Sequence, residues 1–335
     1  MTVRFGAIRW DAWYNNTASA AGAYTQAALG PSEYHFRCPW FATKVSDRQM
    51  AINGNLQSVM DAEIAYAVTA GLKYWAFVWY AQSHAIRAGW NLYQASAQKA
   101  GINWCIAAGY GRFTADIDVG TGTYVGYFQQ SNYEKVLTNR PLVFLLADEG
   151  SAATASTRVT ALRAACSSAG VGDPYIVTMS SGSTVAEANR VTVGGDAISA
   201  YAVFPASLNQ TFATHDAAVQ AVWAAHVGTG AKVIPLCSMG LDRRPRIARP
   251  MSWEVTTQRP YFGMNLYAAT ATPAQLADQI GDCLTFIGAN AAACETESAL
   301  IYAWNEFDEG GWLCPTWTAS GPDTSRLDAI SAVTP

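Results

Sequence analysis

Three carboxylates follow an apolar run near the end of the chain, in a pattern that could support acid–base chemistry. The run Ala299–Trp304 leads directly into Asn305–Gly311, which reads NEFDEGG. Two neighbouring carboxyl groups can act as general acid and base on either side of a glycosidic bond. A buried strand that ends in such a cluster predicts a catalytic site among Glu306, Asp308 and Glu309, in which Asp308 is more often a loop cap than a third catalyst.

Polar and aromatic side chains also follow the other apolar runs. In a barrel the loops after the strands converge on one face, so these side chains are expected to surround the two glutamates. Asp148 and Glu149 form the rival catalytic pair, because many barrel glycosidases place their acid after the fourth strand. The predicted substrate-binding residues are Asp11, Trp13, Tyr14, Trp79, Tyr80, Tyr110, Asp148, Glu149, Tyr201, Asp242, Arg246, Asn305 and Trp312.

Some of these residues have a second interpretation. Trp79 and Tyr80 fit a pocket wall and a packed core equally well. Arg246 is expected to pair with Asp242 and to anchor its loop, with binding of an anionic sugar as the alternative. Aromatic faces stack on sugar rings, but aromatic side chains also fill large cores.

The elements that would position these residues alternate between strand and helix. Strands buried on both faces need crossover helices and read as continuous apolar runs. We therefore predict an α/β fold, a single (β/α)8 TIM barrel over residues 1–335, with long loops after the first, third and seventh strands. The predicted strands are Val3–Tyr14, Leu72–Tyr80, Ile102–Gly109, Pro141–Leu146, Tyr175–Met179, Ala197–Val203, Lys232–Cys237 and Ala299–Trp304. The predicted helices are Met50–Gly71, Asn91–Ala100, Tyr124–Leu137, Ala152–Ala169, Val185–Val191, His215–Gly228, Pro273–Ile287 and Ser325–Val333, and Gly109–Gly122 and Ser238–Asn265 are predicted loops.

Composition and motifs exclude several classes of function. The net charge of -4, with basic residues mostly scattered, argues against a broad nucleic-acid surface. The seven cysteines show no CxxC pair and no ligand spacing with histidine, which argues against a zinc site. No glycine-rich phosphate loop suggests a nucleotide. We therefore expect no metal and no cofactor.

The compartment and the oligomeric state stay open. No apolar run approaches the ~20 residues of a membrane span. The first residues lack the apolar core of a signal peptide, so we expect either no export by that route or prior removal of the signal. If the protein is secreted, a disulfide between Cys283 and Cys294, or between Cys38 and Cys314, is an option.

The segment with the catalytic pair is similar to a known family. Tyr302–Gly310, YAWNEFDEG, resembles the WNEWxEG signature of glycoside hydrolase family 99 and of the related WbsX-like proteins of polysaccharide loci. Val59–Tyr80, Tyr133–Leu146 and Pro235–Arg246 match in the same order, and the last of these resembles a GWDN-x-PR loop. Together these segments extend over most of the chain.

The resemblance implies a retaining, endo-acting glycoside hydrolase for α-mannosides, with a polysaccharide or oligosaccharide as its partner. Carried over by position, Glu306 would be the base that deprotonates the substrate's own 2-hydroxyl. Glu309 would be the acid that protonates the leaving oxygen. The chain has Ala107–Arg112 where WbsX-like proteins have a Trp-Ala-Asn-Glu block, so the sugar itself stays open.

Two other functions fit the sequence. One is a non-catalytic carbohydrate-binding or receptor-recognition barrel, which would bind a glycan without cutting it. The other is a protein of polysaccharide assembly, although the chain shows no nucleotide-sugar loop.

Overall fold

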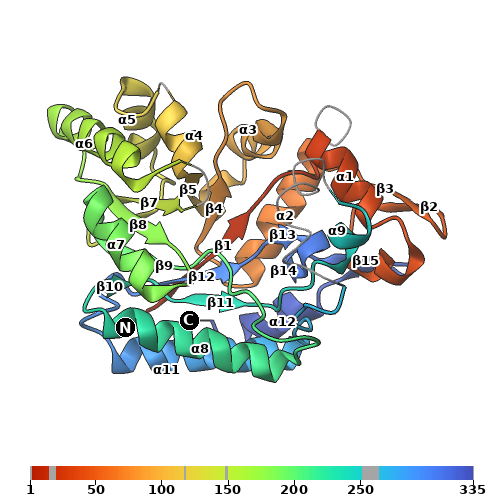
Figure 1. The fold of residues 1–335 in the computed structure, drawn as a ribbon. Coiled ribbons are helices and arrows are strands. Elements are labelled where there is room, and N and C mark those ends of the chain that lie inside the picture. The colour runs from red at the N-terminus through yellow and green to blue at the C-terminus, as the bar shows by residue number, and fades with distance from the viewer. Residues whose placement is uncertain (1, 15–19, 117, 148–149, 251–263, 335) are drawn as a thin grey trace.

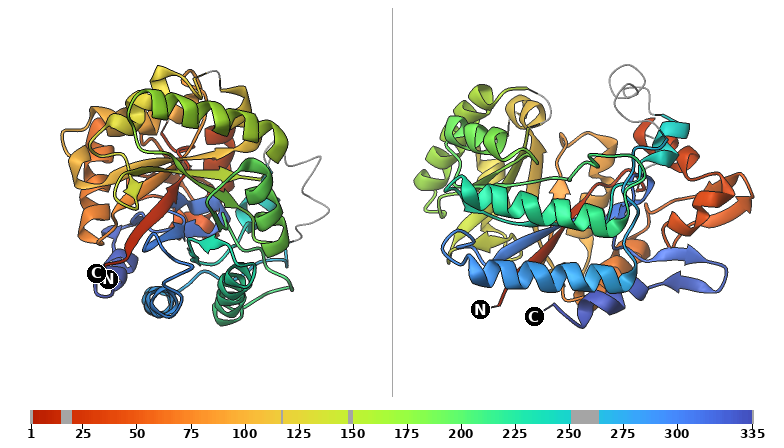
Figure 2. Two further views of the ribbon diagram at one scale, coloured as in Figure 1. Left: turned by 90° about the vertical axis from the view of Figure 1, so that its left-hand side faces the viewer. Right: turned by 60° about the horizontal axis from the view of Figure 1, so that its bottom comes forward.

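A curled parallel sheet forms the centre of the molecule (Figures 1 and 2). The computed structural model describes residues 2–14, 20–116, 118–147, 150–250 and 264–334. Along the sheet the strands follow the order β10-β9-β8-β7-β5-β4-β1-β12-β11, and the short β6 (Lys135–Val136) pairs with β7. These strands are β1 (Arg4–Arg9), β4 (Tyr74–Val78), β5 (Asn103–Gly109), β7 (Arg140–Leu146), β8 (Tyr175–Met179), β9 (Ala197–Ser199), β10 (Lys232–Val233), β11 (Leu236–Ser238) and β12 (Ser298–Tyr302).

One short stretch of chain supplies both ends of this sheet. β10 pairs with β9, and β11 pairs with β12, both in parallel. Only Ile234 and Pro235 separate β10 from β11. Pro235 has no N–H to donate, which interrupts the ladder, while its carbonyl accepts from the backbone of Leu300 at 2.9 Å. The predicted seventh strand therefore bends from one edge of the sheet to the other and so joins the two edges. The predicted α/β barrel is confirmed.

Helices cover the outside of the sheet, as crossover connections between parallel strands require (Figure 2). α8 and α11 lie side by side, and the ring centroids of Trp223 and Phe286 are 5.4 Å apart. α11 begins at Pro273. Thr272 before it and Gln275 in the first turn form a capping box that fixes this start. The main helices are α2 (Gln57–Thr69), α3 (Ala88–Ala95), α5 (Gly122–Gln129), α6 (Ala152–Ser168), α7 (Ser183–Val193), α8 (Phe212–Gly228), α11 (Pro273–Ala289) and α12 (Ser325–Ser331).

The loops after β1, β5, β11 and β12 contain further short elements. The loop after β1 and the segment after β12 are joined where Trp40 N donates to Pro315 O at 3.0 Å and Trp317 N donates to Cys38 O at 2.8 Å. No helix of the described ranges is long and apolar enough to cross a membrane. The short elements are α1 (Ala20–Ala28), η1 (Ser32–Arg37), β2 (Thr43–Ser46), β3 (Gln49–Ala51), α4 (Tyr110–Ala115), α9 (Arg244–Ala248), β13 (Asn305–Glu306), η4 (Phe307–Glu309), β14 (Gly311–Trp312), β15 (Thr316–Thr318) and β16 (Gly321–Asp323).

Several expectations were wrong. The predicted loops Gly109–Gly122 and Ser238–Asn265 contain the helices α4 and α9. The predicted helix Tyr124–Leu137 ends at Gln129, because the backbone after it pairs with Trp104 of β5 instead of continuing the helix. Neither proposed disulfide forms, since all seven cysteines are buried and free.

Candidate active site

Glu306 and Glu309 lie in a tight turn directly after β12. β13 pairs antiparallel with β14 through Glu306 and Gly311, and the short helix η4 fills the turn between them. Gly310 closes η4 with a φ of 87°, and a Cβ there would lie 2.6 Å from the backbone nitrogen of Asp242. Glycine therefore allows both the left-handed backbone and the close approach of the β11–α9 loop.

The hydroxyl of Tyr302 joins the two carboxylates. It lies 3.0 Å from Glu306 Oε2 and 3.2 Å from Glu309 Oε2. The other oxygen of Glu306 accepts a hydrogen bond from the Tyr201 hydroxyl. Glu306 is 3% exposed, and the Glu309 side chain is 15% exposed. Both predicted catalytic residues thus share one buried hydrogen-bonded cluster.

Arginines from the loop after β11 neutralise Glu309. Arg246 Nη1 donates to Glu309 Oε1, and Arg243 Nε lies 3.2 Å from Glu309 Oε2. Arg246 Nε also donates to Asp308 Oδ2 at 2.7 Å. The expected pairing of Arg246 with Asp242 is therefore wrong.

Asp242 instead holds the loop after β1 against the loop after β11. Its Oδ2 accepts from Arg37 and, at 2.6 Å, from Arg244 Nη2. The backbone nitrogen of Asp242 donates to Glu309 O at 2.8 Å. Asp242 thus supports the turn that carries the pair and is 1% exposed.

The two glutamates differ in protonation. Burial first, and then the charge of Glu309, raise the pKa of Glu306 to about 8, against the lowering effect of the Tyr201 hydrogen bond. Burial also acts to raise the pKa of Glu309, but the charges of Arg243 and Arg246 outweigh it and hold that pKa below its ordinary value. The opposite directions of these shifts favour a protonated Glu306 beside an ionised Glu309.

A second layer of side chains holds the start of the turn. Asn305 Nδ2 donates to Asp11 Oδ1 at 2.9 Å, and Asn305 Oδ1 accepts from the backbone of Trp10 at 2.8 Å. The indole of Trp13 donates to the carbonyl of Asn305 at 2.6 Å. Arg9 in turn pairs with Asp11 at 2.8 Å. The predicted residues Asp11, Trp13 and Asn305 therefore support the turn from behind.

The other predicted residues divide between the site and the core. Tyr80 and Tyr201 lie near the pair, since the charge of Glu306 contributes to the raised pKa of both hydroxyls, although burial is the largest cause. Trp79 is stacked on Trp104 with ring centroids 5.7 Å apart and belongs to the core. Tyr14 and Tyr110 are also buried in the core. Asp148 and Glu149 lie outside the described residues.

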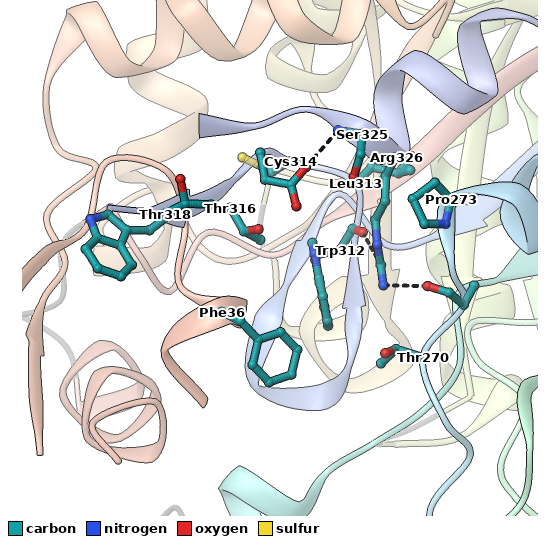
Figure 3. Close-up of a pocket in the computed structure, with 13 residues that line it drawn as sticks. Phe36, Thr270, Pro273, Trp312, Leu313, Cys314, Thr316, Thr318, Ser325 and Arg326 are labelled. Atoms are coloured by element: carbon teal, nitrogen blue, oxygen red, sulfur yellow. Dashed lines mark hydrogen bonds between the residues drawn. The ribbon is translucent and has the colours of Figure 1, made fainter. Parts of the chain in front are cut away.

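Trp312 lines a separate cavity of about 200 Å³, shown in Figure 3. The guanidinium of Arg326 lies 4.0 Å from the centroid of the Trp312 ring and donates to its carbonyl at 2.9 Å. Phe36 lies on the same cavity, with its ring centroid 6.3 Å from that of Trp312. Trp312 was predicted to bind substrate because it follows the last predicted strand. Its ring instead packs against Arg326 and Phe36.

Sequence reasoning missed two residues of the cluster. Tyr302 is the last residue of β12 and was assigned to the strand alone, although a hydroxyl at a strand end beside two glutamates is a usable signal. Arg243 was assigned no role at the site from the sequence. The described residues hold no group of three or more His, Cys, Asp or Glu side chains that could bind a metal ion.

Comparison with solved structures identifies the fold. No protein-family model matches the sequence, and no curated protein is similar enough in sequence to match. A structure of the GH99 endo-α-mannosidase from Bacteroides thetaiotaomicron in complex with bis-tris-propane superposes with a TM-score of 0.62 at 13% identity, covering 98% of this chain and 95% of that one. A second structure of that enzyme gives a TM-score of 0.57 at 12% identity, covering 99% and 95%. The chain therefore has the fold of the family 99 endo-α-mannosidases.

Proposed function

We propose that this protein is a glycoside hydrolase that uses Glu306 and Glu309 to cut within an α-linked polysaccharide or glycan. The observation that carries the proposal is the pair itself, in which a single hydroxyl touches both carboxyl groups and the pKa values of the two carboxyls shift in opposite directions. Such a pair can supply an acid and a base at neutral pH. The fold shared with a GH99 endo-α-mannosidase supports a mannan-like substrate, and retention of configuration is what the family resemblance of Tyr302–Gly310 implies.

The family resemblance and the pKa shifts place the proton of the pair on different glutamates. By family resemblance Glu306 is the base and Glu309 the acid. The pKa shifts favour the opposite distribution of protons in the free protein, with Glu306 protonated. A catalytic cycle with the roles implied by the family therefore begins with movement of one proton from Glu306 to Glu309.

The test is cleavage of a panel of α-linked polysaccharides, with α-mannans first, by the wild type and by Glu306→Gln and Glu309→Gln. Loss of an acid or a base is expected to lower kcat by roughly 10²- to 10⁴-fold. Glu187→Gln is the matched control, because Glu187 pairs with Arg190 on the outer helix α7. Product chain lengths report endo action, and NMR of the fresh product reports its anomeric configuration. Unchanged turnover in either active-site variant excludes that glutamate from the chemistry.

A second candidate is a carbohydrate-binding barrel without catalysis. The observation that favours it is the double pairing of Glu309 with Arg243 and Arg246, which resembles a structural ion pair. Calorimetric binding of an oligosaccharide, with no shorter product after long incubation, supports this function over hydrolysis.

A further inference from the structure

The hydrogen bonds around Tyr302 determine where the protons of the cluster lie. The Tyr302 oxygen is within hydrogen-bond distance of Glu306 Oε2 and of Glu309 Oε2. A phenol has one proton and donates one such bond, so it cannot donate to two carboxylates at once. If both glutamates were ionised, one of these contacts would have no proton between its oxygens, so the geometry favours a proton on one of the two glutamates that is donated to the Tyr302 oxygen.

The remaining contacts identify that glutamate. Arg246 donates to one oxygen of Glu309, and Arg243 lies beside the other, so Glu309 is surrounded by donors and acts as an acceptor. Glu306 accepts from Tyr201 through Oε1, which leaves its Oε2 to carry the proton. The arrangement that satisfies every group is a chain in which Glu306 donates to Tyr302 and Tyr302 donates to Glu309.

We propose that Tyr302 relays a proton between Glu306 and Glu309. In this step the Oε2–H bond of Glu306 breaks as a new O–H bond forms on Tyr302. The original O–H bond of Tyr302 breaks as an O–H bond forms on Glu309 Oε2. The two transfers together move one proton, in net terms, from Glu306 to Glu309. Tyr302 ends neutral, and the negative charge passes from Glu309 to Glu306.

This relay rests on the proposed function and deepens it. It converts the resting pair into the pair that family resemblance requires, with Glu306 as base and Glu309 as acid. A substrate hydroxyl close to Glu306, or displacement of Arg243 or Arg246 from Glu309 by substrate, would favour the transfer. Tyr302 acts through the two glutamates and is therefore a positioning residue.

The surroundings hold the relay in place and keep it neutral. Tyr302 is 0% exposed, and a Cβ on Gly311 would lie 2.5 Å from Cε1 of its ring, so the backbone of β14 packs directly on it. The ring of Tyr201 packs against that of Tyr302 with centroids 5.8 Å apart. Burial, and then the charges of Glu306 and Glu309, raise the pKa of Tyr302 well above its ordinary value. A free tyrosinate is thus disfavoured, and the two proton transfers must occur together.

The location of the proton can be tested without any activity. Infrared spectroscopy of the whole protein is expected to show the band of a protonated carboxyl that is absent in Glu306→Gln. In Glu309→Gln the band persists but titrates at lower pH, because the charge of Glu309 no longer raises the pKa of Glu306. The charged and titratable groups near Glu306 are Glu309, Arg246, Tyr201, Tyr302 and Tyr80. A band that disappears in Glu309→Gln instead overturns the proposal.

The relay itself is tested by a double-mutant cycle. Glu309→Gln should shift the Glu306 band, and in a Tyr302→Phe background that shift should fall by about half or more. Tyr201→Phe is the matched control, because it removes a hydroxyl that touches Glu306 alone, and the shift should survive there. An equal shift in all three backgrounds overturns the relay.

Kinetics then separate the relay from the proposed function. Tyr302→Phe is expected to lower kcat by about tenfold or more with KM within about twofold, and Tyr201→Phe to lower kcat less. If the wild type cleaves no glycan but the infrared cycle behaves as expected, the relay stands and the hydrolase proposal fails. If the wild type is active and Tyr302→Phe retains its kcat, the relay fails and the hydrolase proposal stands.

Discussion

Asp11 Oδ1 accepts a 2.9 Å hydrogen bond from Asn305 Nδ2, although the two residues are 294 positions apart. The bond joins the end of β1 to the turn after β12, which lie side by side because these strands pair in parallel. Asn305 immediately precedes Glu306, so the position of the turn that carries Glu306 and Glu309 depends on the carboxylate of Asp11. Asp11 is itself buried and paired with Arg9.

Asp11→Ala is expected to destabilise the protein strongly. The substitution leaves Arg9 buried with one of its two carboxylate partners, Glu63, and removes the acceptor of Asn305. Breaking a buried ion pair typically costs about 3–5 kcal/mol, and chemical denaturation measures the free energy of unfolding. Asp47→Ala is the control, because Asp47 pairs with Lys44 on the exposed β2–β3 hairpin, and it should leave the free energy of unfolding almost unchanged. Equal effects would show that Asp11 has no special supporting role.

Arg246→Met is expected to destabilise the protein at high pH more than at low pH. Without Arg246, Asp308 and Glu309 lose a buried cation, so the folded-state pKa values of both carboxyls rise. A carboxyl with a raised folded-state pKa loses stabilising free energy as the pH rises. We expect a loss of about 3 kcal/mol at pH 8 and a smaller loss at pH 5.

The control for this experiment is Arg244→Met in the same helix. Arg244 is 33% exposed, and Asp242 keeps Arg37 when Arg244 is removed. Its loss should therefore change the free energy of unfolding by about 1 kcal/mol or less at both pH values. A pH-independent effect of Arg246→Met would contradict the assignment of its two carboxylate partners.

Much of the fold could be predicted because the strands are continuous apolar runs. Lys232–Cys237 was predicted as one strand, yet Pro235 splits it, and only the pairing partners reveal that its halves reach β9 and β12. Gly109–Gly122 contains polar residues and glycines typical of a loop, but α4 packs against α6 and forms a helix there. Tertiary packing overrides local pattern at such positions.

The site could be predicted only in part, for a related reason. The sequence indicates which residues follow a strand, and this identified Glu306 and Glu309. It does not indicate which way each side chain points. Trp79 and Trp312 follow β4 and β13 as a pocket residue should, yet Trp79 stacks on Trp104 and Trp312 packs on Arg326. Contacts across the barrel, such as that between Tyr201 and Glu306, arise only from the closed sheet.

Gly6→Ala is expected to destabilise the barrel, because Gly6 packs against the ring of Tyr74. A Cβ on Gly6 would lie 2.2 Å from two ring carbons of Tyr74, which is fully buried and bonded to Ser298 at 3.0 Å. The ring cannot move away freely, so overpacking should cost about 1–3 kcal/mol. Gly281→Ala in α11 is the control, since apart from the backbone of its own helix and its chain neighbours nothing lies within 4 Å of its added Cβ, and it should gain up to about 1 kcal/mol from helix propensity. Thermal or chemical unfolding distinguishes the two, and a neutral Gly6→Ala would contradict the close packing.

Glu306→Gln is expected to flatten the pH dependence of stability. The pKa of Glu306 is about 8 in the folded protein against an ordinary value of 4.5, so between these values the folded state binds more protons than the unfolded chain. The free energy of unfolding should then fall as the pH rises across this window, by up to about 1.4 kcal/mol per pH unit. Glutamine binds no proton, so the variant should gain stability relative to the wild type between pH 5 and pH 8. Glu309 contributes with the opposite sign, because its lowered pKa adds stability that is lost only as the pH falls below its ordinary range. Parallel stability curves for wild type and variant would show that Glu306 does not hold the proton on which the relay through Tyr302 depends.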